Sequence, residues 1–183
     1  MKSSKLQLMV KIGMLSALAF IIMFFEFPLL PTAPHLKMDL SDIPAIVGAF
    51  AFGPLAGVII ELIKNLLHFI TKTQTGGIGE IANFATGASL VIAAGLIYKR
   101  NKNKTNAIIG LAVGTVLMSV VMCFANYYIL LPLYLPALFE GPKSVVINII
   151  LTTALPFNVL KGIIISVITI LIYKRLSPIL HKK

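Results

Sequence analysis

The stretch from residue 43 to residue 70, IPAIVGAFAFGPLAGVIIELIKNLLHFI, decides how this chain folds. As a single helix it would be about 42 Å long, which exceeds the bilayer's hydrocarbon core of about 30 Å. The pair Gly53-Pro54 offers a break, because proline disrupts a helix interior and glycine punctuates it. The stretch therefore predicts either one overlong helix or two short helices joined by a tight turn.

The composition of the chain is typical of a membrane protein. Of its 183 residues, 58% are hydrophobic and 12% are charged, and the mean hydropathy is +0.96. Soluble domains are nearer half apolar, and about a quarter of their residues are charged. A soluble domain of this size could not bury so many apolar side chains, so lipid is the expected solvent.

The basic residues gather beside the apolar runs and indicate the topology. They form three groups: Lys2, Lys5 and Lys11; Lys99, Arg100, Lys102 and Lys104; and Lys174, Arg175, Lys182 and Lys183. Basic segments next to spans are normally cytoplasmic, so an even number of helices separates the first group from the second. Two helices in the 43–70 stretch satisfy this rule, and one does not. The net charge of +10 thus reflects membrane orientation rather than a nucleic-acid surface, which would need a basic stripe.

We therefore predict an all-α integral membrane protein with six transmembrane helices, one membrane domain over residues 1–183, and both termini in the cytoplasm. The expected helices are 9–25, 43–52, 54–70, 80–98, 106–131 and 156–173. The apolar 144–155 stretch is either an outer extension of the last helix or a separate element.

The first outer loop, residues 26–42, has the features of a lid. Its three prolines prevent it from being helical throughout, and they are Pro28, Pro31 and Pro34. Lys37 and Asp39 are candidate polar contacts of such a lid. Ser41 and Asp42 are explained as caps of the following helix.

Five polar side chains on three of the predicted helices fall in the outer half of the membrane. Counted at about 1.5 Å per residue from the inner end of each helix, they lie at similar depths. They are Glu80, Asn83, Asn126, Asn158 and Lys161. Polar groups inside a bilayer are costly, so each is a candidate for function, and the alternative is hydrogen bonding between packed helices.

The chemistry of this set favours a planar, uncharged heterocycle over a metal ion. Asn158 and Lys161 are three residues apart and share a helix face. With the other amides they offer hydrogen-bond donors, acceptors and one ammonium group. The expected flat apolar walls are Tyr127, Tyr128 and Phe157.

A second polar set lies on the predicted 54–70 helix. Its members are Glu61, Lys64, Asn65 and His68. A buried Glu–Lys pair neutralises itself, so one interpretation is a structural ion pair. The other interpretation is a proton relay along the helix face shared by Glu61 and His68.

No catalytic motif or energy source of its own is indicated by the chain. The phosphate-binding pattern G-x-x-x-x-G-K-[ST] does not occur, nor do H-E-x-x-H, C-x-x-C or G-x-S-x-G. The expected role is that of a binding subunit that a partner energises. On the first helix Gly13, Ala17 and Ala19 form a small surface, suited to docking a partner or to packing within the chain.

Eight segments resemble the riboflavin-binding S components of energy-coupling factor (ECF) transporters, and together they span nearly the whole chain. They are IGMLSALA (12–19), FEFPLLP (25–31), LKMDLSDIP (36–44), FGPLAG (52–57), ELIKN (61–65), TGGIGEIAN (75–83), ANYY (125–128) and PFNVLKG (156–162). The resemblance implies the S-component fold and capture of riboflavin from outside, with no cofactor beyond this transported ligand. It also implies a complex with a transmembrane coupling protein and two cytoplasmic ATPase subunits, in a prokaryotic plasma membrane.

The resemblance also implies roles for individual residues. Asn126, Asn158 and Lys161 resemble the residues that bond the isoalloxazine edge. The residues that resemble contacts to ligand and lid are Leu36, Lys37, Asp39 and Leu40. The 13–17 pair of small residues is the nearest equivalent of the patch through which the family meets the coupling protein.

Three alternatives stand beside this expectation. The same fold could hold a different vitamin or a related flavin. A small intramembrane enzyme could use Glu61 and His68. A structural membrane subunit would bind no ligand at all.

Overall fold

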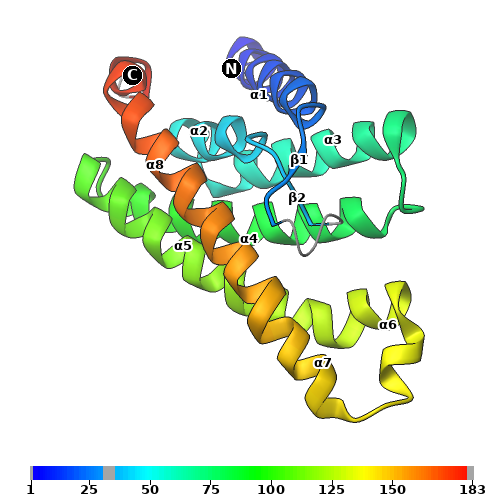
Figure 1. Ribbon diagram of the computed structural model, residues 1–183. Helices are drawn as coiled ribbons and strands as arrows, with labels where there is room; N and C mark the ends of the chain where they lie inside the picture. Colours follow the sequence, from blue (N-terminus) through cyan, green and yellow to red (C-terminus); the bar gives the residue numbers. More distant parts are fainter. Residues whose placement is uncertain (1, 31–35, 181–183) are drawn as a thin grey trace.

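The computed structural model describes residues 2–30 and 36–180, with side chains over 5–30 and 36–173, and it is almost entirely helical (Figure 1). Pro31 and Pro34 of the expected lid lie outside the described residues, as do Met1 and residues 181–183. The helical elements are α1 (Lys2–Met23), α2 (Asp42–Phe52), α3 (Pro54–Lys72), α4 (Ile78–Arg100), α5 (Lys104–Ala125), η1 (Asn126–Leu130), α6 (Leu131–Tyr134), η2 (Pro136–Phe139), α7 (Lys143–Ile149), η3 (Ile150–Ala154) and α8 (Leu155–Leu180). The short strands β1 (Phe27–Pro28) and β2 (Lys37–Met38) pair antiparallel.

Five helical stretches in the described part of the chain are long and apolar enough to cross a membrane. They are Lys5–Met23, Pro54–Lys72, Ile78–Arg100, Lys104–Tyr134 and Lys143–Tyr173. The apolar helix α2 is shorter, with 11 residues. The prediction of an all-α membrane protein is confirmed by this architecture.

The 43–70 stretch forms two helices, α2 and α3, which meet at Gly53. The φ angle of Gly53 is 103°, a conformation that is open to glycine and strained for other residues. Pro54 follows in the first turn of α3, where its missing N–H would have had no helical partner. The two residues together reverse the chain without a loop.

One π-helical turn directly follows α5 and another directly precedes α8, and neither was predicted from the sequence. The turns are η1 and η3, and each is followed at once by a Leu-Pro pair, Leu131-Pro132 and Leu155-Pro156. In both, the N–H of the leucine donates to the carbonyl five residues back. Because proline cannot donate a helical hydrogen bond, the wider turn re-pairs the backbone just before it.

Residues 144–155 extend the last helix and are not a separate element, since α7, η3 and α8 form one helical stretch from Lys143. Figure 1 shows this stretch running alongside α5, with α6 and α7 together at the far end. The largest differences from the expected helix bounds are at the end of α8, which continues to Leu180, and at the start of α1, which begins at Lys2. Its early start has a simple cause, because residues 2–8 contain no glycine or proline.

Aromatic side chains close one end of the helix bundle. The ring of Phe50 stacks on that of Tyr98 at a centroid distance of 4.2 Å, and the Tyr98 hydroxyl lies 3.1 Å from the Tyr173 hydroxyl. The Lys11 ammonium group lies 5.7 Å from the ring centre of Phe52. This end also carries the basic connection between α4 and α5, so it differs from the opposite end, where the two strands lie.

Candidate ligand-binding site

A cavity of about 540 Å³ lies at the end of the molecule that carries the strands. Its volume is within the range of small-molecule sites, about 300–1,000 Å³. Eight predicted contact residues line it: Leu36, Lys37, Glu80, Asn83, Asn126, Phe157, Asn158 and Lys161. They come from β2, α4, η1, α8 and the segment before β2, so elements distant in sequence converge on one space.

The amides of Asn126 and Asn158 face the cavity in equivalent ways. Each side chain donates one N–H to the backbone carbonyl four residues back, Asn126 to Met122 and Asn158 to Ala154, both at 2.8 Å. These bonds fix the direction of each amide and leave its oxygen and its second N–H for a ligand. The two π turns lie beside the amides, since η1 begins at Asn126 and η3 ends at Ala154.

Lys161 brings a buried ammonium group to the same wall. It is 2% exposed, and its Nζ lies 3.3 Å from Oδ2 of Asp42, which is completely buried. Lys161 and Asn158 share a face of α8, as their spacing predicts. Lys161 therefore offers the cavity a cationic donor whose charge is balanced by Asp42, which lies outside the lining.

Asn83 adds an acceptor on the opposite side, from α4. Its Nδ2 donates to Oδ2 of Asp39 at 3.1 Å. Its Oδ1 is buried and has no hydrogen-bond partner among the described residues. A buried acceptor left in this way is costly unless a ligand or water serves it.

Glu80 lines the cavity, but its neighbours already occupy both of its oxygens. Oε1 lies 2.9 Å from Nδ1 of His68, and Oε2 accepts from the hydroxyls of Thr73 at 3.1 Å and Thr75 at 3.4 Å. The carboxylate thus ties the connection between α3 and α4 to the start of α4. Its role is to hold the rim in shape as much as to face a ligand.

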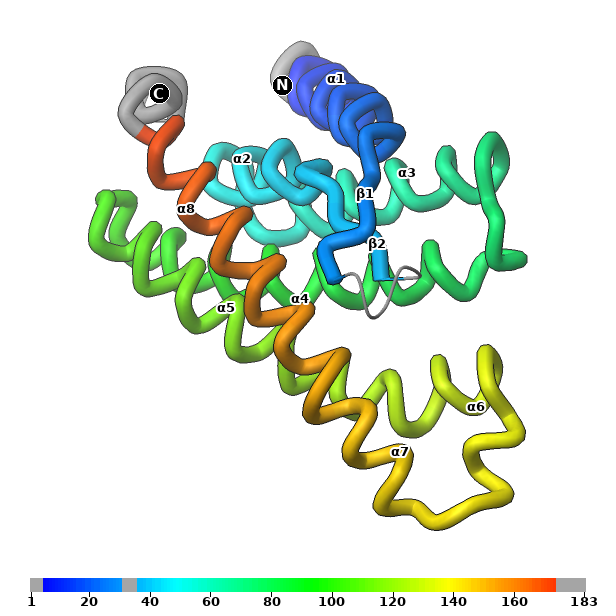
Figure 2. The backbone as a smooth tube through the Cα atoms, viewed as in Figure 1, coloured from blue at the N-terminus to red at the C-terminus, as the bar shows by residue number. Residues whose placement is uncertain are grey.

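Leu36 and Lys37 of the segment around β2 line part of the cavity, and side chains of neighbouring segments hold Lys37 in place. Lys37 of β2 lies 2.9 Å from the Glu26 carboxylate and 3.0 Å from the Gln74 side-chain oxygen. Figures 1 and 2 show the β1–β2 hairpin between the end of α1 and the first half of α4. Three separate segments therefore meet at one partly exposed ammonium group.

Four predicted contact residues lie outside the cavity lining: Asp39, Leu40, Tyr127 and Tyr128. Asp39 is buried behind Asn83, and Leu40 packs against the hydrophobic core. Tyr127 packs against the small apolar cluster around Leu131, and the neighbouring Tyr128 is 70% exposed. Because adjacent helical residues point about 100° apart, an inward Asn126 turns the two tyrosines away from the cavity.

The sequence analysis missed several lining residues. They are Met23, Glu26, Gln74, Thr75, Gly79, Ala82, Thr86, Met122, Leu130, Leu131, Tyr134 and Leu135, and His68 was predicted only as a member of the second polar set. The polar members of the 71–79 loop could have been found, because that loop leads directly into Glu80. Tyr134 could not, because it is brought in by the helical continuation beyond the π turn η1.

Comparisons with known proteins agree on one family. Residues 7–173 match the family model described as ECF transporter, substrate-specific component. The chain belongs to this family. The S component is a transport subunit, and the chain is a multi-pass protein of a prokaryotic plasma membrane.

Several relatives share most of their length with this S component. The riboflavin transporter RibU of Staphylococcus aureus (strain TCH60) is 39% identical over 95% of this chain and 92% of its own length. The riboflavin transporter FmnP of Bacillus subtilis (strain 168) is 34% identical over 95% and 94%. A solved structure described as the S component of a bacterial ECF transporter is 38% identical, covers 97% of this chain and 99% of its own, and superposes with a TM-score of 0.83.

The second polar set of this S component is a buried ion-pair cluster. Glu61 and Lys64 are both fully buried, with Oε2 and Nζ 2.8 Å apart, and Lys64 also pairs with Asp42. A Cβ at position 87 would lie 2.3 Å from the Glu61 carboxylate, so Gly87 makes room for it. His68 meets Glu80 rather than Glu61, so the structure does not join the two residues of the alternative enzyme site.

The small-residue surface of α1 divides between exposed and buried positions. Gly13 and Ala17 are exposed, and Ala19 is completely buried in the hydrophobic core. A Cβ at Gly13 would meet nothing within 4 Å. Ala19 therefore packs inside the S component, and the 13–17 pair alone remains open to a partner.

Proposed function

We propose that this protein is the substrate-binding subunit that captures riboflavin for an ECF-type vitamin importer. The observation that carries the proposal is the convergence of Asn126, Asn158 and Lys161 on one buried cavity. An isoalloxazine ring is flat and has a polar edge of donors and acceptors. The two amides and the ammonium group can serve that edge, and Phe157 and the leucines of η1 and α6 supply apolar surface.

Two further supports come from the relatives and from the chemistry of the lining. Relatives that match over more than nine-tenths of this chain carry the name riboflavin transporter. Each lysine of the lining has an acidic neighbour, Glu26 beside Lys37 and Asp42 behind Lys161. A ligand without net charge suits such a site better than an anion does.

The topology that we propose has six helices, with α2 as the short one and both termini in the cytoplasm. The basic 99–104 segment, the Gly53-Pro54 turn and the early part of α1 belong to the end closed by aromatic side chains, which is the expected inner end. The cavity then opens to the outside. Residues 1–183 act as a single membrane domain in this proposal.

The energy for release must come from partners, because the sequence contains no phosphate-binding loop. We propose a complex with a transmembrane coupling protein and two cytoplasmic ATPase subunits. The exposed Gly13 and Ala17 of α1 form the docking surface, since small residues let helices approach closely. Riboflavin is the transported ligand, and no cofactor is part of the proposal.

A fluorescence titration of the purified protein tests this function. Riboflavin fluorescence should be quenched to a stoichiometric end point when the protein is added in detergent, and the chain has no tryptophan to interfere. Parallel titrations with riboflavin phosphate and with an unrelated vitamin test ligand identity. Failure to quench riboflavin, or equal binding of all three compounds, would contradict the proposal.

A further inference from the structure

The short segment that runs from the end of β2 to the first residue of α2 holds two carboxylates behind the cavity wall. Asp39 is 1% exposed and Asp42 is completely buried, and neither lines the cavity. Each of them contacts a different lining residue on a different helix. Asp39 contacts Asn83 of α4, and Asp42 contacts Lys161 of α8.

The Asp39 carboxylate is fixed at both oxygens. Oδ1 accepts from the backbone N–H of Ser41 at 2.7 Å, and Oδ2 accepts from Nδ2 of Asn83 at 3.1 Å. The contact with Asn83 decides which end of its amide faces the cavity, because the nitrogen is held by the acid. The amide oxygen is left buried and unpaired among the described residues, as a ligand acceptor would be.

The Asp42 carboxylate lies between two lysines. Lys64 has further partners, the Glu61 carboxylate at 2.8 Å and the Ser41 hydroxyl at 2.8 Å. Lys161 forms its ion pair with Asp42, with Nζ 3.3 Å from Oδ2. A buried ammonium group without such a partner would be strongly unfavourable, so Asp42 fixes both the charge and the place of the Lys161 nitrogen.

We propose that Asp39 and Asp42 are positioning residues for the ligand. Asp39 orients the Asn83 amide, and Asp42 holds the Lys161 ammonium group against the cavity. A group that binds a ligand needs such support from a second layer, because an unsupported side chain loses precision. Asp39 directly follows strand β2 and Asp42 begins α2, so residues 39–42 connect this strand to two lining residues. The inference rests on the proposed riboflavin site.

Double-mutant cycles on the full-length protein in detergent test this proposal, with riboflavin quenching as the readout. The matched pairs are Asp42→Asn with Lys161→Met and Asp39→Asn with Asn83→Ala. In the wild-type background each aspartate variant should weaken binding about tenfold, and in the background of its matched partner less than about twofold. The crossed pairs, Asp42→Asn with Asn83→Ala and Asp39→Asn with Lys161→Met, are the controls, and their effects should multiply.

A purely structural role gives a different pattern. Each aspartate variant would then weaken binding by the same factor in every background, and that result overturns the proposal.

If Asp42→Asn alone does not fold because Lys64 loses a partner, the double variant Asp42→Asn/Lys64→Met, which removes one charge of each sign, replaces it in the cycle. If the wild type binds riboflavin but Lys161→Met and Asn83→Ala bind equally well, the positioning proposal fails while the proposed function stands. If the wild type does not bind riboflavin, both fail.

Discussion

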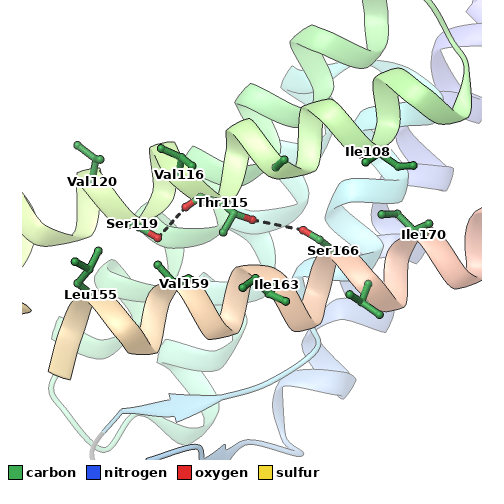
Figure 3. Close-up of a pocket in the computed structure, with 12 residues that line it drawn as sticks. Ile108, Thr115, Val116, Ser119, Val120, Leu155, Val159, Ile163, Ser166 and Ile170 are labelled. Atoms are coloured by element: carbon green, nitrogen blue, oxygen red, sulfur yellow. Dashed lines mark hydrogen bonds between the residues drawn. The ribbon is translucent and has the colours of Figure 1, made fainter. Parts of the chain in front are cut away.

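Two hollows of similar size occur in this protein, and only one has the chemistry of a binding site. The first is the cavity of about 540 Å³ at the end that carries the strands, and the second is a groove of about 490 Å³ between α5 and α8. The cavity lining includes polar groups from segments far apart in the sequence, and the groove is lined mainly by apolar side chains from two helices (Figure 3). Volume alone would not distinguish them.

The difference lies in what the polar groups of each hollow have left to offer. In the groove, the Thr115 hydroxyl donates to the Leu111 carbonyl at 2.9 Å. The Ser119 hydroxyl donates to the Thr115 carbonyl at 2.8 Å (Figure 3). Those hydroxyls are satisfied by their own helix, as is usual in lipid. In the cavity, the amides of Asn83, Asn126 and Asn158 keep unused capacity. A site is therefore marked by polar groups that the fold orients but does not satisfy.

The largest expected effect comes from removing the cavity's buried cation. Lys161→Ala should weaken riboflavin binding by about 2–3 kcal/mol, because a hydrogen bond to a charged group is lost. Quenching titrations of the variant and the wild type measure the change. Melting curves in detergent provide the control, and an unchanged dissociation constant in a folded variant would refute the role of Lys161.

A smaller loss is expected from the neutral amides. Asn158→Ala and Asn126→Ala should each weaken binding by about 1–2 kcal/mol, since each removes a neutral donor and acceptor. The same titration applies to both. The control is Asn65→Ala, whose amide donates to the Glu61 carbonyl outside the cavity lining. An equal effect of all three variants would remove the distinction between cavity and interior.

The contacts that hold Lys37 of β2 in place should contribute less than about 1 kcal/mol to riboflavin binding. Lys37→Ala breaks the contacts with Glu26 and Gln74, which are partly exposed and therefore screened by solvent. Stopped-flow dissociation of riboflavin should be faster, and the difference from wild type should shrink at high salt. Lys72→Ala, which also removes a contact to Glu26 but lies outside the lining, serves as the control. An unaltered rate of riboflavin dissociation would show that the Lys37 contacts do not retain the ligand.

The groove should be almost insensitive to substitution. Ser166→Ala removes a hydroxyl that lies 3.5 Å from that of Thr115, and binding should change by less than about 0.5 kcal/mol. A loss comparable to that of the Lys161 variant would mean that the groove, rather than the cavity, contributes to the site.

Much of the fold could be predicted from the sequence, because lipid imposes simple rules. Apolar runs, basic flanks and the Gly53-Pro54 pair are local signals, and they mark where helices lie and where one chain reversal occurs. The π turns could not be predicted, because their cause is a Leu-Pro pair that ordinarily signals a kink or an end. Tyr134, which lines the cavity, lies in the helical continuation beyond η1.

The depth of the site residues along their helices could be predicted from the sequence, and the direction of their side chains less well. Depth counting brought Asn83, Asn126, Asn158 and Lys161 together, and the structure places all four in the lining. It could not show that Asp39 faces Asn83 instead of the cavity, because that contact joins segments 44 residues apart. Contacts of that kind depend on how helices rotate against each other, which spacing along one helix does not specify.

A structure of the protein determined with riboflavin bound tests the central claim most directly. The account predicts isoalloxazine density in the cavity lined by α4, η1 and α8, with its polar edge within hydrogen-bond distance of Asn126, Asn158 and Lys161. Flavin density in the groove between α5 and α8, or in the cavity with that edge turned away from all three side chains, would contradict it.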